Sequence, residues 1–274
     1  MENLNVKVVG LGEGGARAVS NMISAGVGKG KSVSFAAIGK DENILLSSMS
    51  RENIFLNRDS TTIYKRISSA LRGAKIILVV MGGGSGAAVQ ALPIVIACAK
   101  NNNASTVAFV NRPSVFESVE RRKNCDFCLS VLHRDADTVF DYPTEKFFLL
   151  RLNQPQVSIV ELLAVANDIF CRGADIFLEL TGNAPVAWGN ASFGYGYGAN
   201  ALDALKTAAK FPLLEQDELK RTQRIFVRVT SKKDKAAKNF ITSMIRPDAE
   251  LIWRADDNVT GDKIFASIIF SKGV

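Results

Sequence analysis

The feature that most constrains this chain is a glycine cluster at residues 82–86, which reads Gly-Gly-Gly-Ser-Gly. It directly follows the apolar run Ile76–Val80 and precedes a helix-like stretch from Ala87 to Lys100. A strand that passes through a glycine turn into a helix builds an anion site, because backbone N–H groups point outward there and the helix dipole favours negative charge. Glycine also lets the backbone approach a phosphate without strain. The cluster therefore predicts a phosphate-binding turn.

A similar turn stands near the beginning of the chain. Residues 10–15 read Gly-Leu-Gly-Glu-Gly-Gly and follow the strand-like run Val6–Val9. Their first, third and sixth residues satisfy G-x-G-x-x-G, which is weak evidence alone. By itself this turn allows a Rossmann-type NAD(P) oxidoreductase, with Asp41 as the acid that holds the ribose. The second glycine turn is not part of that pattern, and two such turns predict a nucleotide that is held from two sides.

Strand-like and helix-like runs alternate up to about residue 172, which predicts a parallel sheet with helices on both faces. The expected strands are 5–10, 33–38, 75–80, 106–110 and 137–140, and the expected helices are 15–26, 61–72, 87–100, 116–132 and 158–171. Ligands of such sheets bind beyond the carboxyl ends of the strands. Both glycine turns fall at those ends.

The composition and the pattern of expected elements change after about residue 173. Expected strands at 225–229, 251–255 and 263–270 and expected helices at 199–211 and 235–245 predict a smaller α/β or α+β domain. We therefore expect a nucleotide-binding domain at 1–172 and a C-terminal domain at 173–274, with the boundary inside 173–212. The Gly/Tyr stretch at 194–198 is interpreted as a tight turn with partly buried rings, because glycine chiefly punctuates structure. A stacking platform or an interaction loop is the alternative.

Composition favours a cytoplasmic protein. No apolar stretch approaches the roughly 20 residues that span a bilayer, and the N-terminus lacks the features of a secretory signal. Four cysteines without a framework pattern fit a reducing compartment. The net charge of +7 is interpreted as a solvated surface, and no signature supports nucleic-acid binding. Cys125, Cys128 and His133 supply three ligands where structural zinc usually needs four, so no metal site is expected there.

The order of these motifs resembles the FtsZ/tubulin family, especially bacterial and archaeal FtsZ, from Val6 to about Gly273. Residues 82–88 are similar to the family signature G-G-G-T-G-T-G, with Ser85 in place of the threonine and alanine at the last two positions. The resemblance implies a tubulin/FtsZ-like α/β fold, in which a shortened central helix joins the parallel-sheet domain to the smaller one. It also implies a guanine-nucleotide-binding cytoskeletal protein of cell division that forms filaments.

The resemblance implies roles for individual residues. Glu117 and Arg121 follow a proline at the spacing of the family's ribose-contacting loop, and Asp168 stands in the Ala-Asn-Asp run that reads guanine. Asp41 falls near the γ-phosphate and its metal, so Mg²⁺ joins GTP or GDP as an expected ligand. The full set of expected nucleotide-binding residues is Gly10, Gly12, Glu13, Gly14, Gly15, Arg17, Asp41, Gly82, Gly83, Gly84, Ser85, Gly86, Glu117, Arg121, Leu163, Asn167 and Asp168.

The largest departure from the family concerns hydrolysis. In the family, a loop after the central helix carries two acids that position water at the nucleotide of the next subunit. One alignment places Asp175 on the second acid and Arg172 on the first, and the other deletes the loop. Because positioning and charge stabilisation carry phosphoryl transfer, hydrolysis is expected to be slow or lost, with Asp175 as the candidate catalytic residue. An active polymerising GTPase of cell division is the alternative.

The resemblance also implies the partners of the chain. They are a second copy or a related FtsZ-like subunit. The terminal peptide that recruits membrane tethers in the family is missing from this sequence, so adaptor binding through such a peptide is not expected.

Overall fold

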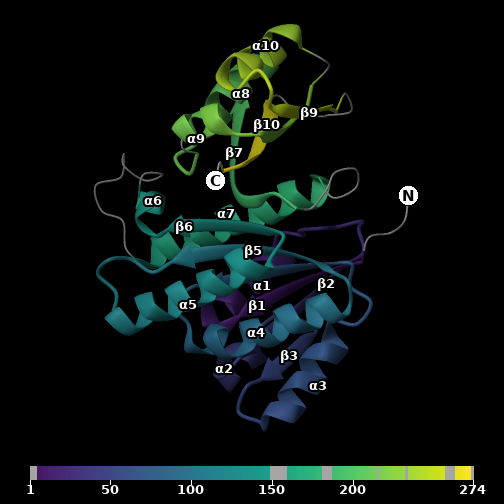
Figure 1. Cartoon of the computed structure of the whole chain (residues 1–274), viewed down its shortest axis with the longest axis vertical. Coiled ribbons are helices and arrows are strands. Elements are labelled where there is room, and N and C mark those ends of the chain that lie inside the picture. The colour runs from purple at the N-terminus through teal and green to yellow at the C-terminus, as the bar shows by residue number, and fades with distance from the viewer. Residues whose placement is uncertain are drawn as a thin grey trace. The chain divides into compact units, whose positions relative to one another are not determined.

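A computed structural model describes residues 5–148, 159–180, 187–214, 216–231, 234–256 and 263–272. The chain divides into two compact units, Met1–Ala187 and Trp188–Val274 (Figure 1). The division falls inside the 173–212 region in which the sequence places the domain boundary. Each unit is described by itself.

The first unit is built on a sheet whose described strands are all parallel. The strand order is β3-β2-β1-β4-β5-β6. The bounds are Val6–Leu11 (β1), Val33–Gly39 (β2), Glu52–Phe55 (β3), Ile76–Gly82 (β4), Ser105–Arg112 (β5) and Thr138–Pro143 (β6). The parallel sheet expected from the alternating pattern is confirmed. Since all strands run the same way, their carboxyl ends meet at one edge.

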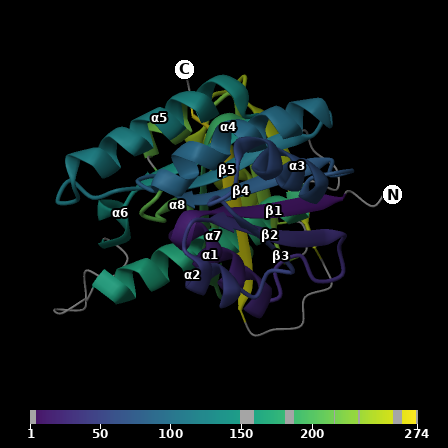
Figure 2. The ribbon, with the colours of Figure 1, turned by 90° about the horizontal axis from the view of Figure 1, so that it is seen from below.

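Helices cover both faces of this sheet. Their bounds are Gly12–Ser24 (α1), Glu42–Leu46 (α2), Ser60–Ala70 (α3), Gly86–Asn101 (α4), Val119–Asp135 (α5), Glu145–Phe148 (α6) and Ile159–Leu180 (α7). Figure 2 shows α3, α4 and α5 on one face and α1 and α7 on the other. Side-chain caps begin four of these helices, at Asp41, Asp59, Ser85 and Ser118.

Aromatic contacts hold α7 on its face of the sheet. Phe109 of β5 stacks on Phe140 of β6 with ring centroids 4.6 Å apart. Phe170 and Phe177 lie seven residues apart on α7, hence on one side of the helix, and pack against these two rings at 6.0 and 6.2 Å. The central helix continues beyond residue 171, where the periodicity predicted its end, as far as Leu180.

The second unit is a mixed sheet with three described helices. Its strands are Gly189–Gly198 (β7), Arg224–Val229 (β8), Glu250–Ala255 (β9) and Ile264–Ser271 (β10), in the order β7-β10-β8-β9. The strand β10 is antiparallel to both neighbours, whereas β8 and β9 are parallel. The helices are Ala201–Ala209 (α8), Gln216–Arg221 (α9) and Lys235–Met244 (α10). None of the helices in the described part of the chain has the length and apolar character that a membrane crossing requires.

The interpretation of residues 194–198 as a tight turn is wrong, because they form part of β7 and pair with β10. Their glycines serve close packing. A Cβ at Gly196 would lie 2.5 Å from the backbone N of Ala208, and one at Gly198 would lie 2.3 Å from that of Ala204. Glycine thus lets α8 lie directly on the strand, a use that the sequence does not distinguish from chain reversal.

Candidate functional site

The two glycine turns lie side by side at the carboxyl edge of the first unit. Their strands are direct neighbours, with Gly10 opposite Val80. A Cβ at Gly12 would lie 2.2 Å from the Oγ of Ser85, and one at Gly14 would lie 3.7 Å from the backbone N of Gly82. The sequence predicts two turns, and the structure brings them together as one site.

Close approach explains why the first turn requires glycine. A Cβ at Gly10 would lie 2.3 Å from the carbonyl oxygen of Gly15, and one at Gly15 would lie 2.5 Å from that of Val80. Gly12 adopts a φ of +71°, a region that side chains with a Cβ rarely occupy. The helix α1 can therefore start directly at the end of β1, with its N-terminus at the sheet edge.

The edge formed by these turns suits an anion. The residue that precedes α1 is Leu11, whose side chain cannot cap, so it leaves the N–H groups of the first turn without a side-chain acceptor. A Cβ at Gly82 or Gly86 would meet no atom within 4 Å, so the backbone there borders open space. Ser85 accepts from the N–H of Ala88 at 3.4 Å, which leaves its O–H as a donor. Backbone and hydroxyl donors of this kind bind phosphate.

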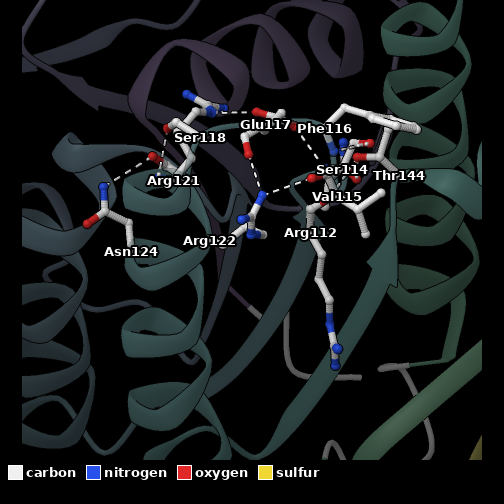
Figure 3. Close-up of polar contacts among 12 residues, drawn as sticks. Arg112, Ser114, Val115, Phe116, Glu117, Ser118, Arg121, Arg122, Asn124 and Thr144 are labelled. Carbon is white, nitrogen blue, oxygen red and sulfur yellow. Dashed lines mark hydrogen bonds and ion pairs between the residues drawn. The ribbon is translucent and has the colours of Figure 1, made fainter.

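Glu117, on the loop between β5 and α5, pairs with Arg121 in the first turn of α5 (Figure 3). The Nε of Arg121 donates to Glu117, and the other carboxylate oxygen of Glu117 accepts from the N–H of Ser114 at 2.9 Å. Arg121 lies against Gly84, where a Cβ would stand 3.0 Å from its Nε. Asn124 of α5 donates to the carbonyl of Gly84 at 3.3 Å. The helix α5 therefore contacts the second glycine turn, and Arg121 links the loop to it.

Residues that the sequence analysis did not single out hold this loop in shape. Glu145, in the first turn of α6, accepts from the N–H of Val115 at 2.7 Å. Arg122 donates to the carbonyls of Val115, at 2.9 Å, and Glu117. Burial alone would raise the pKa of Glu145, but hydrogen bonds, first that from Val115, lower it overall. The sequence gives little indication of the roles of Glu145 and Arg122, since charged residues in the first turns of helices are common.

Three further contacts tie the ends of β5 and β6 together. The hydroxyl of Thr144 donates to the carbonyl of Arg112 at 2.6 Å and to the Oδ1 of Asn111 at 2.9 Å. The guanidinium of Arg112 pairs with the buried carboxylate of Asp141 on the neighbouring strand. The loop after β5 thus starts from an anchored base.

Asp41 lies just beyond the carboxyl end of β2, the strand beside β1. It caps α2, where its Oδ1 accepts from the N–H of Ile44 at 3.1 Å. The second carboxylate oxygen remains for another ligand, which fits the single carboxylate with which Mg²⁺ is often held beside phosphates. Glu13 and Arg17 are exposed on the first two turns of α1.

The residues expected to read the base lie on α7, which packs against α1. Asn167 is half-buried and Asp168 is exposed. Among the residues that the structure describes, the Asp168 carboxylate has no hydrogen-bond or ion-pair partner, so it is available to a ligand. Leu163 belongs to α7, but its side chain lies outside the described part of the structure.

Asp175 also lies on α7. The helix is continuous through Arg172 and Asp175 to Leu180, and Asp175 is half-buried. This contradicts the alignment in which a loop after the central helix carries Asp175. The residue stands two turns along the same helix from Asp168 and not on a loop that could reach out to another subunit.

The cysteines near the second turn pack in the core. Burial raises the pKa of Cys125 to about 11 and that of Cys128 to about 12, so both stay protonated at neutral pH. A Cβ at Gly83 would lie 2.4 Å from the Sγ of Cys125, which shows that the helix α5 packs directly under the turn. His133 is exposed, and the described residues contain no cluster of three metal-ligating side chains.

Comparison with known proteins extends these observations. No family model matches the chain. A curated relative, the cell division protein FtsZ of Caulobacter vibrioides, is 26% identical over 289 aligned positions, which cover 91% of this chain and 56% of the relative. The chain thus spans little more than half the length of that relative.

Solved structures match over almost the whole chain. A single-substitution variant of FtsZ from M. jannaschii has a TM-score of 0.80 at 21% identity, with 98% of this chain and 91% of that chain covered. An empty FtsZ dimer from M. jannaschii also gives 0.80 at 21% identity, over 99% and 88% of the two chains. A GTPγS-bound protofilament of CetZ2 from Haloferax volcanii gives 0.79 at 16% identity, over 97% and 92%.

The parallel sheet, its double glycine turn and these matches define an α/β protein of the tubulin/FtsZ fold class. Within that class, the sequence match to FtsZ and the structural matches to FtsZ and CetZ support an FtsZ-like family member. The resemblance seen in its motifs is confirmed.

Proposed function

We propose that this protein is a cytoplasmic, FtsZ-like cytoskeletal protein that binds GTP or GDP at the carboxyl edge of the first unit. The observation that carries the proposal is the contact between the two glycine turns. Gly12 stands against Ser85, and Arg121 stands against Gly84. These are elements that can surround one polyphosphate, and the comparisons with FtsZ and CetZ favour a guanine nucleotide over NAD(P).

Each part of the site has a role in this proposal. The N–H groups at the start of α1 and around Gly82–Gly86 donate to the phosphates, where the positive ends of α1 and α4 also stabilise negative charge. Glu117 accepts from the ribose hydroxyls, and the guanidinium of Arg121 binds a phosphate or ribose oxygen. Asp168 accepts from the N1–H and amino group of guanine, a pair of donors that adenine lacks.

Hydrolysis is slow or absent in this proposal. Asp41 would hold Mg²⁺, which supplies charge stabilisation when bound. The catalytic water needs a positioned acid, and Asp175 lies half-buried within α7 beside Arg172. A carboxylate fixed in a helix in this way is poorly placed to orient water at a neighbouring subunit.

Self-association completes the proposal. Two of the matched structures are described as a dimer and as a protofilament. We expect this chain to assemble with a second copy or with a related FtsZ-like subunit, and nucleotide binding at the sheet edge to promote that assembly.

Nucleotide content tests the proposal most directly. The purified protein is denatured, and the released nucleotide is identified by ion-exchange chromatography against GDP, GTP and NAD(P) standards. Guanine nucleotide is the expected result. An empty protein that binds none of these on titration, or one that carries NAD(P), would overturn it. Light scattering after addition of GTP then reports assembly, and phosphate release in the same sample reports hydrolysis. Together they distinguish a protein that assembles but hydrolyses GTP slowly from an active polymerising GTPase.

A further inference from the structure

The second unit contains a cavity that the proposed nucleotide site does not use. Its volume is about 300 Å³, and it is lined by Tyr195 of β7, by Lys206 and Thr207 of α8, and by the segment Lys210–Pro212 that follows this helix. The volume lies at the lower end of the range of ligand sites, which fits one or two side chains and not a large cofactor.

The floor of the cavity is aromatic and its rim is cationic. The rings of Tyr195 and Phe211 pack with their centroids 4.6 Å apart. Lys206 and Lys210 are exposed and lie four residues apart, so both stand on one side of α8. Among the described residues, neither ammonium group has an ion-pair or hydrogen-bond partner. An apolar hollow beside two free ammonium groups is complementary to an apolar side chain flanked by carboxylates.

The backbone around the cavity argues against a phosphate ligand. Phosphate sites present outward N–H groups at helix N-termini, whereas this cavity lies at the C-terminal end of α8. The N–H groups of Lys210 and Phe211 already donate to carbonyls of the helix, and Pro212 has none. The described residues that line the hollow include no arginine, which could bind a phosphate with two hydrogen bonds. The remaining donors are flexible ammonium groups, which suit carboxylates.

We infer that this cavity is a docking site for an acidic peptide segment of a partner protein. An aromatic or aliphatic side chain of this segment enters the hollow and packs on the paired rings of Tyr195 and Phe211, and acidic residues on either side of it pair with Lys206 and Lys210. The two ammonium groups beside the hollow make an acidic segment the complementary occupant.

A fluorescence-polarisation titration tests the inference with a labelled peptide, Gly-Glu-Asp-Phe-Asp-Glu. Two comparison peptides replace the acids by their amides or the Phe by Gly. We expect the acidic Phe peptide to bind at least about tenfold more tightly than either, and its affinity to fall as salt rises from about 50 to about 500 mM.

Three variants locate the binding. The charge reversal Lys206→Glu with Lys210→Glu should weaken binding at least about tenfold. Thr207→Trp, at an exposed helix position, should fill the cavity and weaken binding while both lysines remain. Lys238→Glu on α10 is the matched control and should keep the parent affinity within about twofold.

The inference is overturned if the charge-reversal pair and Lys238→Glu bind the peptide alike, or if the amide peptide binds as well as the acidic one. Competition by GTP would assign the binding to the first unit instead. If the Lys206→Glu, Lys210→Glu variant changes its oligomeric state but keeps its affinity for the peptide, the cavity is a contact between copies of this chain and the inference is wrong. Because the readout does not involve nucleotide, failure here leaves the proposed nucleotide site untouched.

Discussion

Gly12 and Ser85 face each other across the ends of two neighbouring parallel strands, so closely that a Cβ on residue 12 would lie 2.2 Å from the serine oxygen. The contact joins residues that are far apart in the sequence. It also defines the entrance of the proposed phosphate site, because α1 and α4 both begin beside it.

The substitution Gly12→Ala should strongly weaken nucleotide binding. The alanine would suffer both the strain of a φ of +71° and the clash with Ser85. Gly26→Ala is the matched control, since Gly26 has the same φ of +71° but no atom within 4 Å of an added Cβ. We expect Gly26→Ala to lower the free energy of unfolding by about 1–2 kcal/mol and to leave affinity intact. Gly12→Ala should lower affinity by more than about tenfold in isothermal titration calorimetry. Equal behaviour of the two variants would show that the contact has no functional role.

The substitution Asp168→Asn should change base selectivity. An amide keeps an acceptor but adds donors, so it mismatches guanine and matches xanthine. Hydrogen bonds to charged groups contribute about 1.5–3 kcal/mol, so GTP affinity should fall about ten- to a hundredfold while XTP affinity rises. Asp126→Asn, at an exposed position of α5, is the control and should leave both affinities unchanged. Unaltered GTP preference in Asp168→Asn would remove this residue from the site.

Glu145 should act as a positioning residue with a pH signature. Its pKa is lowered below the ordinary value of 4.5, chiefly by the Val115 N–H against the opposing effect of burial. A lowered folded-state pKa means that its contribution to stability is full above about pH 4.5 and is lost as pH falls through the lowered pKa. Glu145→Gln should therefore lower the free energy of unfolding by about 1 kcal/mol at pH 7 and leave it unchanged at low pH. Urea unfolding at several pH values measures this difference.

The same variant separates a structural role from a positioning one. Glu145→Gln should weaken nucleotide binding a few-fold at pH 7, because the loop that carries Glu117 loses its charged anchor. Glu120→Gln, exposed on α5, is the control for the loss of one negative charge. If the two variants show the same stability at every pH, the negative charge of Glu145 adds nothing to its hydrogen bond with Val115.

Phe116 should contribute to assembly and not to folding. It is 92% exposed on the anchored loop beside the proposed nucleotide site, where a rigid aromatic group is suited to be a contact hot spot. Phe116→Ser should change the free energy of unfolding by less than about 0.5 kcal/mol and reduce the sedimented fraction in the presence of GTP. Phe127→Ser, which changes a 43% exposed side chain on α5, is the comparison. Undiminished sedimentation of Phe116→Ser would place the interface elsewhere.

Much of the first unit could be predicted from local patterns. The strand β4 is a continuous apolar run that ends at Gly82, and β1 is apolar apart from Lys7 and leads directly into the first glycine turn. The strand β3 was not predicted, because its four residues, Glu52–Phe55, show no clear alternation of apolar and polar side chains. They form a strand only by pairing with β2. The prediction for residues 194–198 was wrong for a related reason. Glycine occurs both in turns and where a helix packs closely on a strand, and only the position of α8 distinguishes these two cases.

The candidate site divides in the same way. Glycine at residues 10–15 and 82–86 is a chemical requirement of a local turn, so the residues alone indicate it. The Glu117–Arg121 spacing gained its interpretation from its resemblance to the ribose-contacting loop of the family. The supporting contacts of Glu145, Arg122 and Asn124 could not be predicted, because each joins segments whose distance depends on how strands β4, β5 and β6 align.

The amino-acid order alone determined most of the strands and helices and both glycine turns, because periodicity, caps and glycine act over a few residues. It also determined the family resemblance, since that depends on motif order. Only the tertiary structure decided that Gly12 meets Ser85, that Arg121 lies on Gly84, and that α7 carries Asp175 within a continuous helix. These relations depend on helix packing and on parallel pairing between strands that are distant in the sequence. Both are decided by the folding of the whole chain, in which the burial of apolar surface offsets the loss of conformational entropy.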